Sequence, residues 1–305
     1  MKKQLLIAAV AATMGTAAIA DISITGGAKV NYVYTQTNNT ASTNAINHDM
    51  DLDIVGKNGD TTVVVHIGGI EASGTTDMAT EDVYLTTKIG DVNLKTGNWD
   101  NGNNLIRQSG RLDGKVSLST TFQGVTATFD DAENSNATFK VAGSVSGVDA
   151  YFKKGTITDD FGLKTTVAGV TVDYNSMGSD TANSDRDSIR VDGTVSGIAL
   201  TYAAVNADSA VRVSGDGWLG DYEATTLSNG ADVSGFGASM PLAGNTVQVK
   251  SITVDATNDT DYTKFYVTRA LSNGATFEAI YTDKDVAGST SSDTETLDLE
   301  LAVKF

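Results

Sequence analysis

Hydrophobic and polar residues alternate along this chain with a period of two. From residue 297 to residue 305, the odd positions carry Leu, Leu, Leu, Val and Phe, and the even positions carry Asp, Glu, Ala and Lys. A helix would mix the two kinds of residue on every face, whereas a strand separates them onto two faces. Residues 22–34 repeat the pattern, as do the segments around Val116, Phe139 and Ile189. The alternation predicts an all-β protein.

The connections between the predicted strands fall into two unequal classes. One class is short and mostly centred on glycine, which suits tight hairpins because a central residue needs positive φ. The other class is longer, polar and often acidic. The short connections lie at residues 57–60, 90–91, 123–124, 146–147, 168–169, 196–197, 242–245 and 272–274, and the longer ones include 36–47, 70–80, 98–113 and 207–231.

Alternating short and long connections place the short ones on one rim of the sheet and the long ones on the other. This is the arrangement of an outer-membrane barrel. A soluble β-sandwich also alternates polar and apolar residues, but its loops have similar lengths at both ends. Counting strands through the eight short connections gives eighteen. A barrel of that size encloses water rather than a packed core.

Aromatic residues favour the barrel independently, because amphipathic rings prefer the two membrane interfaces. One predicted girdle lies near the long loops and the other near the short turns. The first comprises Tyr34, Phe129, Phe152, Phe161, Tyr174 and Tyr281, and the second Phe122, Phe277 and Phe305. A closed barrel also requires residues 22–34 to pair with residues 297–305, since an open edge in lipid leaves backbone groups unpaired.

The first twenty residues have the pattern of a secretory signal peptide. Lys2 and Lys3 precede the apolar run 5–12, and Ala18-Ile19-Ala20 is a small-residue cleavage site. We therefore expect a cleaved leader, 1–20, and a single barrel domain, 21–305. No later segment approaches the roughly 20 consecutive apolar residues of a membrane helix.

The composition excludes several classes of function. The chain has no cysteine and only two histidines, His48 and His66, which argues against thiolate metal sites, cysteine nucleophiles and histidine-based catalysis. We expect no enzyme, no cofactor and no resident metal. Its 21 basic residues face 38 acidic ones, a net charge of −17, which excludes a nucleic-acid binder. Loss of the leader would leave 19 basic residues and a charge of −19.

Three acidic or glycine-rich motifs have simple interpretations. Residues 215–220 spell G-x-G-x-x-G, but no amphipathic helix follows, so we interpret them as an external loop. Asp49, Asp51 and Asp53 alternate with apolar residues and lack the glycine and closing Glu of an EF-hand. In a barrel they would line the pore. The acidic loops at 180–187, 255–261 and 283–285 either hold divalent cations against lipopolysaccharide phosphates or simply stay solvated.

Three stretches of the chain resemble the trimeric general porins of Gram-negative outer membranes, most closely the alphaproteobacterial type. They are the opening residues 22–29, the strand at 83–85 and the hairpin 89–97, which is similar to the family's F-G-x-x-x-x-G hairpin with Ile in place of Phe. The terminal Phe305 resembles the family's assembly signal. The resemblance implies a homotrimer of 16-stranded barrels with a third external loop folded inward, in contact with outer-membrane lipid and lipopolysaccharide.

By position, the inward loop implied by the resemblance is residues 98–113. Its charged residues, the candidates for the constriction, are Asp100, Arg107, Arg111 and Asp113. The loop is short and lacks the acidic stretch that the family usually has there, and the usual arginine cluster cannot be carried over by motif. Sixteen strands also disagrees with the direct count of eighteen, so we expect a barrel of 16–18 strands.

Strand phase predicts a charge field across the lumen. The predicted basic wall comprises Lys88, Lys95, Lys115, Lys140, Lys153, Lys164 and Arg190, and the acidic wall Asp49, Asp51, Asp53, Glu278, Asp298 and Glu300. We therefore predict a water-filled, weakly cation-selective channel for small hydrophilic solutes and ions. The alternatives are a substrate-selective channel, for which the inward aromatics Tyr84 and Tyr151 are too few, and a non-conducting structural or adhesive barrel.

Overall fold

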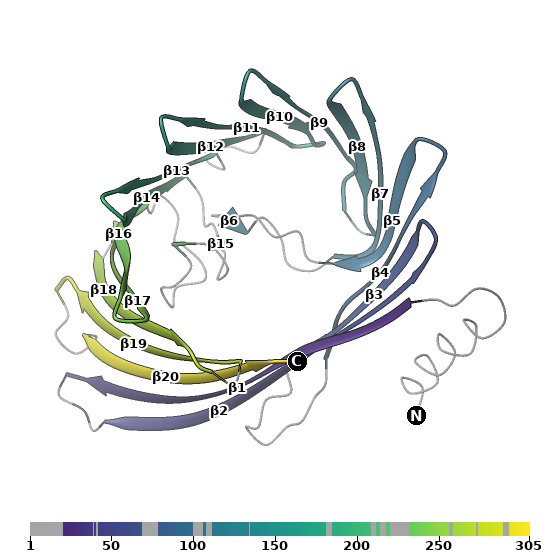
Figure 1. Ribbon diagram of the computed structural model, residues 1–305. Coiled ribbons are helices and arrows are strands. Elements are labelled where there is room, and N and C mark those ends of the chain that lie inside the picture. The colour runs from purple at the N-terminus through teal and green to yellow at the C-terminus, as the bar shows by residue number, and fades with distance from the viewer. Residues whose placement is uncertain are drawn as a thin grey trace.

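The computed structural model describes residues 21–38, 40, 42–68, 79–99, 106–107, 112–133, 135–180, 185–208, 212–213, 218–219, 232–255, 259–272, 274–288 and 293–305. The predicted leader, 1–20, lies outside the described residues. No helix within the described ranges is long and apolar enough to cross a membrane. The main element is a closed antiparallel β-barrel of 18 strands (Figure 1).

Each barrel strand pairs with the next along the chain, and the last pairs with the first. The barrel strands are β1 (Asp21–Thr37), β2 (Thr43–Asn58), β3 (Thr61–Gly68), β4 (Ala79–Ile89), β5 (Val92–Trp99), β7 (Leu112–Phe122), β8 (Val125–Asp131), β9 (Thr138–Val145), β10 (Val148–Lys154), β11 (Thr158–Val167), β12 (Val170–Ser179), β13 (Arg186–Val195), β14 (Ile198–Ala207), β16 (Asp232–Leu242), β17 (Asn245–Asp255), β18 (Thr260–Ala270), β19 (Ala275–Val286) and β20 (Thr294–Lys304). The count of eighteen is confirmed. Sixteen, which the resemblance implied, is wrong because eight connections at the short-turn rim and nine at the opposite rim join the strands of this chain.

The seam between the two ends of the barrel has the predicted antiparallel pairing. Tyr34 lies opposite Leu297 and Gly27 opposite Lys304. Beyond the last strand, Gly26 and Phe305 exchange two backbone hydrogen bonds, of 2.8 and 2.9 Å. The sheet therefore has no open edge at the seam, as a barrel in lipid requires.

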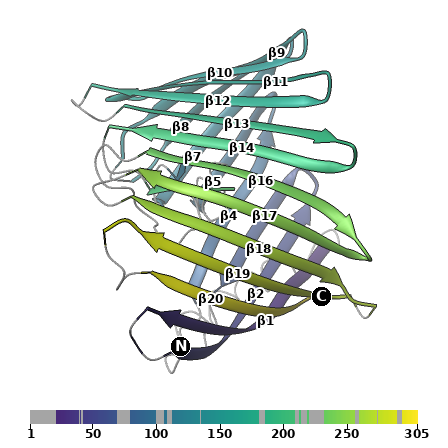
Figure 2. The same cartoon turned by 90° about the vertical axis from the view of Figure 1, so that its left-hand side faces the viewer.

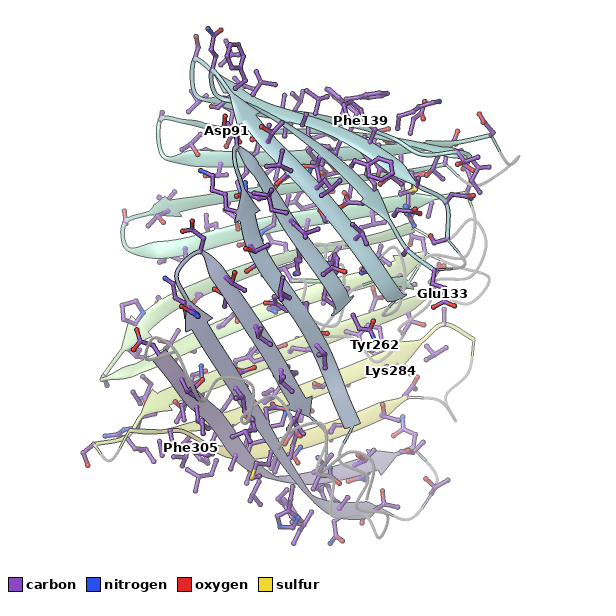
Figure 3. All side chains as sticks on the ribbon, turned by 90° about the vertical axis from the view of Figure 1, so that its right-hand side faces the viewer. Asp91, Glu133, Phe139, Tyr262, Lys284 and Phe305 are labelled. Atoms are coloured by element: carbon purple, nitrogen blue, oxygen red, sulfur yellow. The ribbon has the colours of Figure 1, made fainter. Side chains whose placement is uncertain are left out.

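The short connections are confirmed as tight turns and gather at one rim (Figure 2). In five of them both central residues have positive φ, about 50° and then about 80°, which defines a type I′ turn. The second residue of each pair is glycine, and the pairs are 123–124, 146–147, 168–169, 196–197 and 243–244. Figure 3 shows Asp91 and Phe305 at this rim and Glu133 at the opposite, long-loop rim.

The outer face of the barrel is apolar. On β20, Leu297, Leu301 and Val303 expose 37–47% of their surface, far more than core residues would. Aromatic residues lie opposite each other on neighbouring strands of this face, as Phe129 and Phe139 do. The ring centres of Phe265 and Tyr281 lie 6.4 Å apart. Figure 3 shows Phe139 projecting from the outer surface. Such a belt would be costly in water and matches the hydrocarbon of a bilayer.

Two short strands lie inside the barrel, separate from its wall. β6 (Ile106–Arg107) and β15 (Arg212–Val213) pair only with each other in the described chain, and Figure 1 shows them within the ring of barrel strands. Following β15, Trp218 and Leu219 are buried in a cluster with inward residues of β14, β16, β17 and β18. The prediction that residues 215–220 form an external loop is therefore wrong at Trp218 and Leu219, because this apolar pair packs against the inner wall.

Candidate functional site: the barrel lumen

The inner face of the barrel carries the charged residues that strand phase selected. Cross-strand partners share a face, so the register defines this set: for example, Lys140 lies opposite Lys153, and Lys153 opposite Asp160. By the same phase the structure places inward Lys88, Lys95, Lys115, Lys140, Lys153, Lys164, Arg190, Asp49, Asp51, Asp53, Glu278, Asp298 and Glu300.

The candidate constriction residues are only partly described. Arg107 belongs to β6, so its backbone lies in the lumen, as an inward loop requires. Asp113 belongs to the beginning of β7, at the barrel wall. Asp100 and Arg111 lie outside the described residues, and for Arg107 and Asp113 the description covers the backbone.

An acidic sector occupies the inner face from β19 through the seam to β4. Its carboxylates are Asp49, Asp51, Asp53, Asp82, Glu278, Asp298 and Glu300. Inward lysines of the same strands offset much of this charge: they are Lys29, Lys57, Lys88, Lys284 and Lys304, and the Lys29 Nζ lies 3.2 Å from Asp49. The His66 Nδ1 lies 2.7 Å from Asp53. Glu278 and Glu300 stand directly opposite each other. Like charges at this separation repel each other.

A second, mixed sector lies on the inner face of β7 to β13. A cavity of about 760 Å³ runs along the β7–β12 part of it, from Gly124 near the short-turn rim to Asn136 near the long-loop rim. Its charges are largely matched: Lys153 Nζ lies 3.8 Å from Asp160, and Lys164 Nζ lies 3.6 Å from Asp173. The cavity therefore presents many polar groups with little net charge.

Beside the cavity, Arg190 and Asp192 of β13 form two hydrogen bonds, of 2.8 and 3.0 Å. This pairing extends the matched charges of the mixed sector to its last strand.

An aromatic ring lies flat along the wall of the mixed cavity. Tyr151 donates a hydrogen bond of 2.9 Å to Asn175, two strands away, and Lys140 Nζ lies 4.2 Å from the centre of its ring. The ring crosses Gly162, where an added Cβ would come within 2.1 Å of it. Only glycine at that position leaves room for the ring.

Further lysine–aromatic contacts line the lumen. Lys95 Nζ lies 3.8 Å from the ring centre of Tyr84 and 4.4 Å from that of Trp99. Lys250 Nζ lies 5.1 Å from the ring of Trp218 and 5.0 Å from that of Tyr266. These distances suit cation–π attraction. They place lysine–aromatic groups on both sides of the lumen.

A looser contact of the same kind joins adjacent strands, where Lys284 Nζ lies 5.7 Å from the ring of Tyr262 (Figure 3). Tyr262 is buried on the inner face of β18.

The conclusion from sequence that inward aromatics are too few is wrong. Beside Tyr84 and Tyr151, the described inner face carries four others: Trp99, Trp218, Tyr262 and Tyr266. Phase alone could have found the last two, which alternate with the outward Phe265.

The basic wall is also more extensive than predicted. Lys250 and Lys264 stand opposite each other on β17 and β18 and are buried, and neither was in the predicted basic wall. Among the described residues, no three His, Cys, Asp or Glu side chains are grouped as a metal site would require.

Comparison with known proteins supports the fold. No family model and no curated protein matches the sequence. The crystal structure of OccK2 (OpdF) from Pseudomonas aeruginosa matches with a TM-score of 0.72 and 10% identity, covering 93% of this chain and 98% of that chain. OpdL from the same organism gives 0.69 at 9% identity, covering 93% and 99%. OccAB4 from Acinetobacter baumannii gives 0.66 at 11% identity, covering 93% and 98%.

The chain shares the fold of these outer-membrane channels. At 9–11% identity the likeness concerns the fold alone. The resemblance to the alphaproteobacterial general porins stays a prediction, now without its sixteen strands.

Proposed function

We propose that this protein is a Gram-negative outer-membrane channel through which small hydrophilic solutes and ions diffuse passively. The observation that carries the proposal is the contrast between the two faces of one closed barrel. The outer face is an apolar belt, and the inner face is lined with lysines, carboxylates and amides. An 18-stranded barrel is wide enough for an aqueous channel, and the solved structures of the same fold are outer-membrane channels.

A substrate-selective channel is the second candidate. Two observations favour it: chain segments lie within the lumen, and the inner wall carries lysine–aromatic groups. Such groups can retain a solute that has both an apolar face and polar substituents. The homotrimer and the contacts with lipopolysaccharide stay predictions.

Planar-bilayer recording tests the proposal. We expect ohmic single-channel conductance in potassium chloride, and in liposomes we expect swelling rates that fall with the size of a neutral sugar. A steep preference for one sugar over others of equal size would favour the selective channel instead. A barrel that inserts but never conducts would be a structural or adhesive protein.

Ion selectivity gives a second readout. The chain carries a net charge of −17. In a gradient of dilute potassium chloride we therefore expect a zero-current potential whose sign shows a preference for potassium over chloride. The preference should weaken as salt rises, because the Debye length falls from about 10 Å at 0.1 M to about 3 Å at 1 M. Anion preference in dilute salt would mean that the lysines control the narrowest part of the lumen.

A further inference from the structure

The Tyr151 ring forms a flat platform on the inner wall of the mixed cavity, across three neighbouring strands (Figure 1). Tyr151 belongs to β10, its ring crosses Gly162 of β11, and its hydroxyl donates the hydrogen bond of 2.9 Å to Asn175 of β12. Inward side chains otherwise stand roughly perpendicular to the sheet, so the glycine is what lets this ring lie along the wall. The ring is held at its backbone end and at its hydroxyl end, and one of its faces is directed at the lumen.

An ion pair borders the platform on each side along the strands. Toward the long-loop rim, Lys153 Nζ lies 3.8 Å from Asp160, and toward the short-turn rim Lys164 Nζ lies 3.6 Å from Asp173. In the register, Lys153 and Lys164 are each two residues from the level at which Tyr151 crosses to β11, or about 7 Å. Groups that donate hydrogen bonds and groups that accept them therefore stand at both edges of the ring.

The mixed cavity has room for a small solute and little net charge. Its volume of about 760 Å³ lies within the range of small-molecule pockets, roughly 300–1,000 Å³. Its lining includes four lysines and five aspartates. An ion of either sign would therefore meet like charges among the opposite ones, whereas a hydroxyl group can donate to an aspartate and accept from a lysine.

We propose that the mixed cavity binds a neutral saccharide, with one sugar ring packed on Tyr151. A pyranose has the matching surface, because its C–H groups form an apolar face and its hydroxyl groups project from the edge. The face packs on the tyrosine ring, and the hydroxyl groups bind the ion pairs beside it. The two pairs stand about 13 Å apart along the strands, a spacing that suits two linked sugar rings better than one. This inference rests on the proposed function and adds a binding site to it.

The Lys140 ammonium lies over the same ring, with its Nζ 4.2 Å from the ring centre. A sugar packed on the ring takes the place of this ammonium, which has three donors and a flexible stem and can bind a sugar hydroxyl instead. Because a cation–π contact is given up, we expect binding in the millimolar range. Binding of that strength lets a solute leave the channel as well as enter it.

Block of the ionic current in planar bilayers tests the site, with maltose as the probe. Maltose should reduce the single-channel potassium chloride current in a saturable way and add current noise. Glucose should require a several-fold higher concentration for the same block. A polyethylene glycol of the same hydrodynamic size should lower the current without saturation, because it lacks the sugar's apolar face and ring of hydroxyl groups.

Variants of the platform locate the block. Tyr151→Ala should raise the half-blocking concentration of maltose roughly tenfold or more, as loss of a central aromatic contact does at other binding sites. Gly162→Ala displaces the ring instead of removing it and should weaken the block in the same direction. Tyr151→Phe keeps the ring and should change the block by about threefold at most. Tyr202→Ala is the matched control, since it removes a tyrosine from the outer face, and it should leave the block unchanged.

A double variant separates a sugar site from a site for charged solutes. Lys164→Gln combined with Asp173→Asn removes both charges of one ion pair and keeps donors and acceptors, so maltose block should shift by about threefold at most. Glycylglycine, a zwitterion, should block the parent only weakly. Strong block by glycylglycine, lost in the double variant together with maltose block, would show a site for charged groups and overturn the proposal.

Maltose block that does not saturate, or that Tyr151→Ala and Gly162→Ala leave unchanged, would also overturn the site while the channel itself stands. No conductance in the unmodified protein would instead refute the channel. Heat-resistant migration in gels identifies variants that assembled, and only those enter the comparison.

Discussion

The contact of Trp218 with the inner wall offers the sharpest test of how this residue affects conduction through the lumen. Trp218 exposes 9% of its surface, and its ring lies over two glycines of β16. We predict that Trp218→Ala frees the segment that carries it from the wall. Trp218→Phe keeps most of the ring and is the matched comparison.

The size of the effect follows from the burial. An aromatic side chain buries about 150–250 Å², which at about 25 cal/mol per Å² contributes roughly 4–6 kcal/mol. The indole N–H finds no hydrogen-bond partner in the part of the chain that the structure describes, and this costs about 1–3 kcal/mol. The net contribution is about 3 kcal/mol, or roughly a hundredfold in the docked-to-undocked ratio. Phenylalanine loses ring area but also the unsatisfied donor, so it should cost about 1 kcal/mol or less.

Single-channel recording reports the docking directly. Trp218→Ala should raise the mean conductance or the open-channel current noise, and Trp218→Phe should resemble the parent. Gly237→Ala should shift the same quantities in the same direction, because its Cβ would meet the ring at 2.6 Å. Gly27→Ala is the control, an inward glycine whose nearest contact would be 3.6 Å. If Trp218→Ala assembles normally yet conducts with the parent's amplitude and noise, the ring does not hold the segment and the reasoning fails.

Two further predictions concern glycines beneath rings. Gly26→Ala should lower the yield of heat-resistant barrel, as deletion of Phe305 should, because the new Cβ would lie 2.6 Å from a backbone oxygen and 2.9 Å from the Phe305 ring; normal yields, equal to those of Gly27→Ala, would contradict this. Gly162→Ala should displace the Tyr151 ring and lower the free energy of unfolding by about 1–3 kcal/mol, measured by thermal unfolding. It should also change the rate of liposome swelling in sugar more than Tyr151→Phe does. Equal behaviour of those two variants would show that the ring's position is unimportant.

The barrel itself could be predicted because its determinants are local. A period of two separates the faces of each strand, and turn pairs such as Ser146-Gly147 fix each hairpin without reference to distant residues. Closure needs one further physical fact, that lipid leaves no partner for an open edge. Together these gave the strand count and the pairing of residues 22–34 with the C-terminal strand.

The lumen was predicted less completely, for two different reasons. Lys250, Lys264 and Tyr266 follow the same strand phase as the residues that were predicted to face inward. They could therefore have been predicted from the sequence. Trp99 has the same phase as the inward Lys95, but the sequence analysis assigned it to the loop 98–113 and therefore read no side-chain phase there.

The pairing of β6 with β15 could not be found from periodicity at all. These strands contain two residues each, and they pair across a long stretch of chain rather than through a hairpin. Trp218 sits in a glycine-rich segment whose composition is typical of an external loop. Only the inner wall, with its missing side chains on β16, makes the burial of Trp218 favourable.

The missing side chains point to a physical rule for this barrel. Tyr151 lies over Gly162, Trp218 over Gly235 and Gly237, and Phe305 against Gly26. Alternating side chains stand roughly perpendicular to a sheet, so a large ring can lie flat only where its neighbour has no Cβ. A glycine within a strand is destabilising, because it has no side chain to pack and loses more backbone entropy on folding than other residues do. A contact that only glycine permits can compensate for this cost. An aromatic residue within reach supplies that contact. The glycines of these strands therefore carry information about the lumen and the seam that hydrophobic periodicity omits, because periodicity records which face a side chain occupies and not where a side chain is absent.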